Sequence, residues 1–138
     1  MASERIPERK DIPVEYTWDL TDIFPSDEAW LNEYEALKTE GEKISAFAGK
    51  LGENAETLLA YFRLEDELSV RLEKLMGYAN CKSDEDTAQG YYQDLKSKAM
   101  SVYVSIAGAS AFSAPEIMAI PEDVLDGFYA ACPELEEY

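Results

Sequence analysis

The strongest constraint on the fold is an apolar series that repeats with helical spacing in the second half of the chain. Its members follow one another at steps of four and three residues: Ala88, Tyr92, Leu95, Ala99, Val102, Ile106 and Ala109. That spacing places side chains on one face of an α-helix, whereas the side chains of a half-buried strand alternate at every second residue. The series therefore predicts a helix of about 25 residues that buries one face against other helices.

The segment ahead of the helices combines large apolar side chains with a helix start. Leu20, Ile23 and Phe24 have the spacing of one helical turn. Pro25 ends that turn, because its ring disfavours helical geometry at the preceding residue. Ser26 is a candidate N-cap, and the acidic side chains after it suit the positive end of a helix dipole. A helix of about twenty residues is predicted to begin directly after Ser26.

A second long helix follows a glycine turn. Gly49 is typical of the end of the first helix, and Asn54 is a candidate N-cap for the second. The second helix is predicted to run unbroken over residues 54–82. Its apolar stripe has heptad-like spacing and consists of Leu68, Leu72, Leu75 and Ala79. Ser83 and Asp86 then resemble a capping box, so the third helix is predicted to begin at Ser83.

Three prolines organise the end of the chain. Pro115 ends or follows the third helix, and Pro121 suits the first position of a short helix. After Pro133, the sequence from Glu134 onward begins what resembles another helix. One turn of helix is unstable alone because nucleation is costly. We therefore expect the chain to be a fragment of a longer polypeptide.

These patterns predict an all-α fold in residues 15–138, in which three long helices form an antiparallel bundle and a short helix follows. Residues 1–14 are polar and contain two prolines, so we expect a flexible lead-in without a fold of its own. Trp18 is expected to pack against the helical body and fix the lead-in to it. Residues 101–114 are mainly small or β-branched, so this half of the third helix is expected to be buried on more than one side.

The charge of the chain excludes several classes of partner. The sequence has 29 acidic and 12 basic residues, for a formal net charge of -17. Nucleic acid and anionic membranes bind clustered Lys and Arg, so neither is an expected partner. Lys98 is the last basic residue, and seven carboxylates follow it. We interpret them as a solvated acidic surface, with a surface that meets a basic patch elsewhere as the alternative.

The cysteines and the apolar segments predict a cytoplasmic protein. Cys81 and Cys132 lie far apart without metal-ligand spacing, so we expect reduced thiols. No stretch approaches the ~20 apolar residues that a membrane helix requires. Residues 1–13 mix charged residues with prolines and lack the apolar run of a signal peptide.

The residue types that carry catalysis are largely missing. The chain has no histidine, which is the commonest general base and the commonest zinc ligand. Residues 108–112 superficially resemble a nucleophile elbow, but Phe112 replaces its second glycine and no histidine is present to activate a serine. Close helix packing is the better explanation of that segment.

The acidic residues also lack the spacing of a metal site. Asp19, Asp22, Asp27 and Glu28 do not match a calcium loop, and we interpret them as turn and cap residues. Four acids on the second helix lack the Glu-x-x-His partner of a carboxylate-bridged metal site and are interpreted as a solvated face: Glu65, Asp66, Glu67 and Glu73. We therefore predict no catalytic, cofactor-binding or metal-binding residue in this chain.

The tyrosines allow two interpretations. Tyr91, Tyr92 and Tyr103 lie on one predicted helix. They are interpreted as residues at the edge of the core, with a groove that stacks on peptide side chains as the alternative.

The opening of the chain also resembles a known family. The run WDLTDIFP at residues 18–25, followed by an acidic helix start and Trp30, resembles the N-terminal signature of the oligoendopeptidase F family. That family consists of zinc-dependent oligopeptidases of the thimet-oligopeptidase type. Four later segments are similar to the same family in the same order: residues 75–79 (LMGYA), 83–87 (SDEDT), 114–117 (APEI) and 120–122 (IPE). The resemblance covers roughly residues 15–138, which correspond to the non-catalytic beginning of such an enzyme.

The resemblance implies a function for the longer polypeptide. It implies the N-terminal helical domain of a zinc metallopeptidase that hydrolyses internal bonds of short peptides, and this domain helps wall the substrate channel. The zinc would be held by an HExxH motif, which this chain lacks, so the chain alone is expected to be inactive. The implied partners are the catalytic domain of the same polypeptide and oligopeptide substrates. The alternative is a free-standing interaction module that binds a partner helix along residues 101–114, a face through which the isolated chain is also expected to self-associate.

Overall fold

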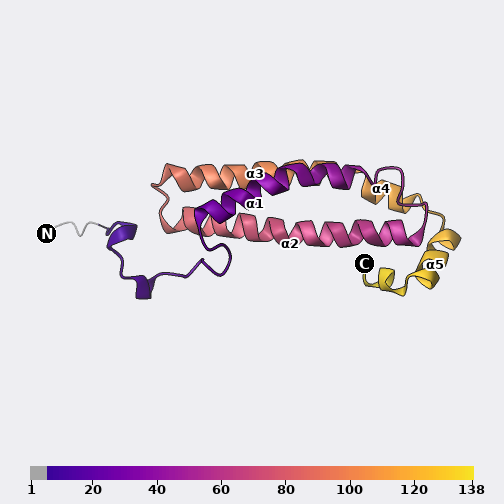
Figure 1. Cartoon of the computed structure of the whole chain (residues 1–138), viewed down its shortest axis with the longest axis horizontal. Helices are drawn as coiled ribbons and strands as arrows, with labels where there is room; N and C mark the ends of the chain where they lie inside the picture. The colour runs from indigo at the N-terminus through magenta and orange to yellow at the C-terminus, as the bar shows by residue number, and fades with distance from the viewer. Residues whose placement is uncertain (1–5) are drawn as a thin grey trace.

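The computed structural model describes residues 6–138, so the part of the predicted lead-in that falls on residues 1–5 lies outside the described residues. Three long helices dominate the described part, and it contains no strand: α1 (Asp27–Ser45), α2 (Ala55–Glu85) and α3 (Gly90–Ser110). Along the long axis of the molecule, α2 runs in the direction opposite to α1, and α3 runs in the direction opposite to α2 (Figure 1). Each helix is therefore antiparallel to the next. The predicted all-α antiparallel bundle is confirmed.

Three shorter elements close one end of the bundle: α4 (Ser113–Met118), α5 (Glu122–Ala131) and the 3-10 helix η3 (Pro133–Glu137). α5 packs against η3 and α2, so the chain turns back toward the start of α2 (Figure 1). Leu135 is buried, and the ring of Tyr138 stacks on Phe62 with the centroids 4.9 Å apart. Tertiary contacts therefore hold the last helical turn. The sequence predicted one short helix in this region, and α4 was missed.

The predicted helix starts at Ser26 and Asn54 are confirmed. The Ser26 hydroxyl accepts a hydrogen bond from the backbone N–H of Ala29 at 3.1 Å, and the Asn54 side chain accepts one from Thr57 at 2.7 Å. Both bonds pair a donor that the first turn of a helix leaves free. Between the two helices, Gly49 has φ +78°, the left-handed conformation expected after a helix end.

The predicted start of the third helix at Ser83 is wrong. α2 continues to Glu85, and Ser83 lies inside it with a relative exposure of 1%. The apolar stripe explains the difference, because Ser83 follows Ala79 at a step of four and faces the same core. Asp86 does begin the loop, where its side chain accepts a hydrogen bond from Ala88 at 3.1 Å. α3 then begins at Gly90.

The core consists of the apolar stripes that the sequence predicted. α1 packs on both α2 and α3, which also pack on each other. The residues that these stripes bury include Trp30, Leu37 and Ile44 of α1, Leu68, Leu72, Leu75 and Ala79 of α2, and Leu95, Ala99, Val102 and Ile106 of α3. Gly41 of α1 faces α3, and a Cβ added there would make an ordinary van der Waals contact of 3.5 Å with the Cβ of Ala109.

The expected packing of Trp18 is wrong, because its side chain is 81% exposed. Leu20 is buried in its place, within a turn in which the N–H groups of Ile23 and Phe24 donate to the Leu20 carbonyl. The Asp19 carboxylate accepts a hydrogen bond from the Thr21 N–H at 2.9 Å and fixes the chain direction just before that turn. The anchoring turn is therefore present, but its buried residue is an aliphatic one.

The segment before that turn forms two short 3-10 helices, η1 (Arg9–Asp11) and η2 (Val14–Tyr16). The Arg9 guanidinium pairs with Glu85 at the end of α2 at 2.8 Å. The flexibility of the lead-in stays a prediction.

The expectation that residues 101–114 are buried on more than one side is also wrong for this chain. Val102 and Ile106 are buried, while Tyr103 and Val104 are 47% and 59% exposed. The reason is geometric, because α1 and α2 both lie against the same side of α3. Within residues 6–138, no single helix is long and apolar enough to cross a membrane, and a pair bent by 107° meets that criterion only when its helices are combined.

The two tryptophans provide a direct test of this packing. Trp30→Ala should lower the free energy of unfolding by about 3–5 kcal/mol, because it removes a fully buried aromatic side chain. Trp18→Ala should change it by less than about 0.5 kcal/mol, because that side chain lies in solvent. Urea unfolding followed by circular dichroism measures both variants. A larger loss for Trp18→Ala than for Trp30→Ala would contradict the structure.

Candidate functional site

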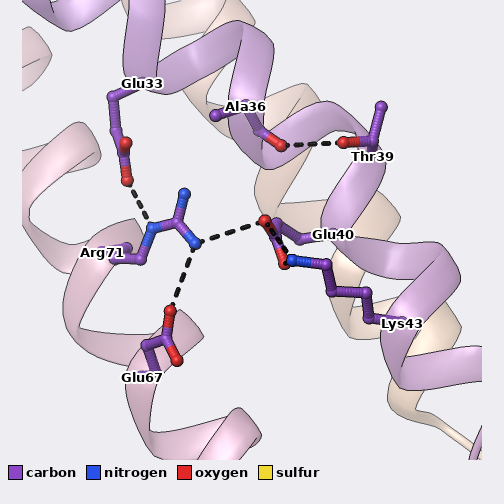
Figure 2. Close-up of polar contacts among 7 residues, drawn as sticks. All are labelled: Glu33, Ala36, Thr39, Glu40, Lys43, Glu67 and Arg71. Carbon is purple, nitrogen blue, oxygen red and sulfur yellow. Dashed lines mark hydrogen bonds and ion pairs between the residues drawn. The ribbon is translucent and has the colours of Figure 1, made fainter.

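A polar cluster around Arg71 connects α1 to α2 (Figure 2). The Arg71 Nε atom donates to Glu33 at 2.6 Å, and its Nη1 atom lies 3.4 Å from a Glu40 oxygen. Nη1 also lies 3.5 Å from Glu67, one turn earlier on α2. Glu40 in turn pairs with Lys43 at 3.0 Å. One guanidinium therefore contacts three carboxylates on two helices.

The electrostatics of this cluster are those of a structural ion network. The Glu40 side chain is only 9% exposed, and a buried carboxylate is costly unless it is paired. Its neighbours Arg71 and Lys43 supply the two positive charges that it requires. The hydrogen bond to Glu33 raises the pKa of Arg71, and burial opposes this shift. Arg71 therefore stays charged and holds α1 against α2.

A second polar cluster joins all three long helices at the start of α1. The Asp27 carboxylate accepts hydrogen bonds from the Tyr78 hydroxyl at 2.6 Å and from the Tyr92 hydroxyl at 3.2 Å. The Lys82 ammonium lies 5.6 Å from the ring centroid of Tyr78 and 5.8 Å from that of Tyr92. Burial raises the pKa of both tyrosines, and the negative charge of Asp27 raises it further. Both hydroxyls are therefore neutral hydrogen-bond donors near neutral pH.

Two open cavities flank the Arg9–Glu85 ion pair. One has a volume of about 480 Å³ and is lined by the apolar side chains of Ile12, Tyr16, Trp18 and Leu20, together with Cys81. The other has a volume of about 570 Å³ and is lined by charges of both signs and by aromatic rings, among them Lys10, Asp27, Lys82, Asp86, Tyr91 and Tyr92.

The first cavity is lined by a side chain that could act as a nucleophile, the Cys81 thiol. A nucleophile needs an adjacent base, and histidine, which most often supplies it, is absent from the chain.

The acidic residues that the sequence analysis considered as possible metal ligands lie apart from one another in the structure. Asp19 accepts hydrogen bonds from Thr21, which lower its pKa, and Asp27 accepts from the two tyrosines. On α2, Glu65 accepts from the Tyr61 hydroxyl at 3.3 Å, while Glu67 reaches Arg71. Across residues 6–138, no group of three or more Cys, Asp or Glu side chains is placed to hold a metal ion. The absence of catalytic, cofactor-binding and metal-binding residues stays a prediction.

The remaining candidates have structural environments. Ser110, in the segment that resembles a nucleophile elbow, donates its hydroxyl to the Ala107 carbonyl at 3.1 Å. Tyr92 packs against the core as interpreted, whereas Tyr91 and Tyr103 are each 47% exposed. Sequence reasoning missed the Arg71 cluster. Only the spacing of Glu67 and Arg71, four residues apart, indicated part of it.

Comparison with known proteins identifies relatives of this chain. No family model matches the chain. Oligopeptidase PepF of Bacillus subtilis (strain 168) is 40% identical to it over 142 residues, which cover 100% of this chain and 21% of that protein. The chromosomal oligoendopeptidase F of Lactococcus lactis subsp. cremoris is 40% identical over 114 residues, which cover 82% of this chain and 19% of that protein. The chain therefore matches the N-terminal region of oligoendopeptidase F proteins.

A solved structure extends this relationship to the fold. The crystal structure of oligoendopeptidase-F from Enterococcus faecium aligns with a TM-score of 0.72 and 26% identity, over 82% of this chain and 22% of that one. The chain matches the N-terminal part of its relatives and spans about a fifth of their length. The resemblance seen in the sequence is confirmed. Both polar clusters therefore lie in the region that matches the N-terminal part of these oligoendopeptidases.

The Arg71 cluster predicts unequal effects for two arginines. Arg71→Ala should lower the free energy of unfolding by about 2–3 kcal/mol, because Glu40 loses one of its two cations in a buried position. Arg63→Ala is the matched control, because its ion pair with Glu134 is exposed and should contribute less than about 1 kcal/mol. Urea unfolding of the two variants measures the difference. Equal losses would show that burial does not strengthen the Arg71 network.

The Asp27 cluster predicts how the free energy of unfolding changes at alkaline pH. A raised pKa favours neutral Tyr78 in the folded state, so its contribution persists below the ordinary value of 10.0 and is lost as the pH rises above it. Tyr78→Phe should lower the free energy of unfolding by about 1–3 kcal/mol at pH 7, because it removes the hydrogen bond to Asp27. The decline above pH 10 should become shallower.

Chemical denaturation at several pH values from 7 to 11 measures both effects. The exposed Tyr103→Phe variant is the control and should match the wild type within about 0.5 kcal/mol at pH 7. An unchanged decline above pH 10 in Tyr78→Phe would contradict the assignment of this pH dependence to Tyr78.

Proposed function

We propose that this chain is the non-catalytic N-terminal helical domain of a zinc-dependent oligoendopeptidase, which hydrolyses internal bonds of short peptides. Its helices would help wall the channel that admits oligopeptides to the active site. The observation that carries the proposal is the match over 100% of this chain, at 40% identity, to a protein named oligopeptidase PepF. That match uses only 21% of the relative, which leaves most of an enzyme beyond the matched region.

The residues of this chain do not fit a zinc centre. A catalytic zinc needs three protein ligands, which normally include imidazole, and a base that takes a proton from the bound water. The chain has no histidine, and its two cysteines are separate free thiols. The zinc ligands and the catalytic base would therefore lie in the rest of the polypeptide. The part of this domain in catalysis would be to shape the space in which the substrate lies.

Two features support a shaping role. The helices run side by side along one axis, and α1 is fixed to α2 by the Arg71 cluster and to α2 and α3 by the Asp27 cluster (Figure 1). A wall must keep its shape while substrates enter and leave, and this double attachment resists sliding of the helices. We also propose a cytoplasmic location, which the two free thiols support.

The proposal is tested with the polypeptide encoded when the same reading frame continues beyond residue 138. It should contain HExxH and should cleave an internally quenched fluorogenic oligopeptide in a zinc-dependent manner. Changing the first histidine of HExxH to alanine should reduce turnover to background, because a zinc ligand is lost. The 138-residue chain should give no turnover.

The controls separate the proposal from its alternative. A stop codon directly after residue 138 would contradict the peptidase proposal and favour the free-standing interaction module. Zinc-dependent turnover by the 138-residue chain alone would contradict the non-catalytic role. Inactivity of the extended polypeptide with its zinc site filled would contradict the peptidase activity itself.

A further inference from the structure

The second half of α3 and the turn after it carry no charge. Residues 99–115 contain neither an acidic nor a basic side chain, although 30% of the whole chain is charged. One side of this segment is accounted for, because Val102 and Ile106 are buried in the bundle core. The opposite side faces away from both α1 and α2. Its exposed side chains are apolar, small or hydroxyl-bearing, whereas most solvated helix faces carry charged residues.

That opposite side is a continuous uncharged stripe, which we call the outer stripe. Its members follow one another at steps of four, three and four residues: Met100, Val104, Ala107 and Ala111. All four side chains are exposed, and Met100 and Val104 are exposed by 48% and 59%. Tyr103 lies beside the stripe and is 47% exposed. The steps place the four residues on one helical face, opposite the buried face of Val102 and Ile106.

Gly108 lies beside the outer stripe, four residues after Val104. A Cβ added there would meet nothing within 4 Å. No other part of residues 6–138 therefore approaches this face at Gly108.

We propose that the outer stripe is the docking face for an apolar helix from the remaining part of the same oligoendopeptidase F polypeptide. This inference rests on the proposed function, which makes this chain one region of a longer enzyme. The matched relative has about four fifths of its length outside the aligned region, enough for many helices. The stripe has no charge to pair, so its partner presents an uncharged face. Its alanines allow the two helix axes to approach closely.

The experiment compares thiol accessibility in the 138-residue chain and in the extended polypeptide. Val104→Cys places a thiol in the outer stripe, and Glu35→Cys places one on the charged face of α1, where the native side chain is 65% exposed. Each protein is labelled with a maleimide, and peptide mapping by mass spectrometry gives the rate at each site. Both thiols should react rapidly in the 138-residue chain. In the extended polypeptide, Val104→Cys should react at least about tenfold more slowly, while Glu35→Cys keeps its rate.

Other occupants of the stripe give different results. Equal labelling of Val104→Cys in the two proteins would overturn the proposal. Protection that depends on protein concentration in both the 138-residue chain and the extended polypeptide would assign the stripe to a second copy and also overturn it. Protection only when phosphatidylcholine vesicles, which carry no net charge, are added would assign the stripe to a lipid surface, with the same consequence.

Turnover separates this proposal from the proposed function. Fluorogenic peptide cleavage is measured with the extended polypeptide that carries the native Val104. Protection of Val104→Cys without turnover would support the docking face and contradict the peptidase activity. Turnover with full labelling of Val104→Cys would support the peptidase activity and overturn the docking face.

Discussion

The register of α1 on α2 depends on the indole of Trp30. Its side chain is fully buried, and its N–H donates to the backbone carbonyl of Leu75 at 2.8 Å. A buried indole N–H needs such an acceptor, so this bond fixes where α1 lies along α2. Three successive contacts follow the same antiparallel register: Asp27 with Tyr78, Trp30 with Leu75, and Glu33 with Arg71. A slip of one turn would break all three, so apolar packing and both polar clusters specify the same arrangement.

Local signals predicted most of the fold, because they concern interactions within a few residues. The N-caps at Ser26 and Asn54 and the left-handed Gly49 each depend only on the adjacent turn. The predicted helix start at Ser83 was wrong because a serine can either cap a helix or continue a buried stripe inside one. Only the packing of the core decides between these two roles. The predicted burial of Trp18 was wrong because apolar character favours burial in general, but it does not determine which residue of a turn points inward.

The polar clusters were largely beyond prediction, because they join residues far apart in the chain. Glu33 and Arg71 are 38 positions apart, and Asp27 and Tyr92 are 65 positions apart. Which carboxylate meets which donor depends on the register of two helices, and neither helix specifies that register alone. The sequence predicted correctly that α1 would begin with acidic residues. That Asp27 also accepts hydrogen bonds from two tyrosines required the three helices to be in place.

The distribution of charge gives the bundle two chemically different sides. Two arginines connect different elements of the bundle: Arg71 bridges α1 and α2, and Arg63 pairs with Glu134 of η3. The excess of acidic side chains lies on surfaces that water can solvate, and repulsion between them disfavours contact of those surfaces with other acidic ones. The second half of α3 has neither positively nor negatively charged side chains. A partner can therefore bind there without removing a charged group of this segment from water. The uncharged half of α3 thus differs from the charged faces of α1 and α2, and the same helices that form the core determine which way this half faces.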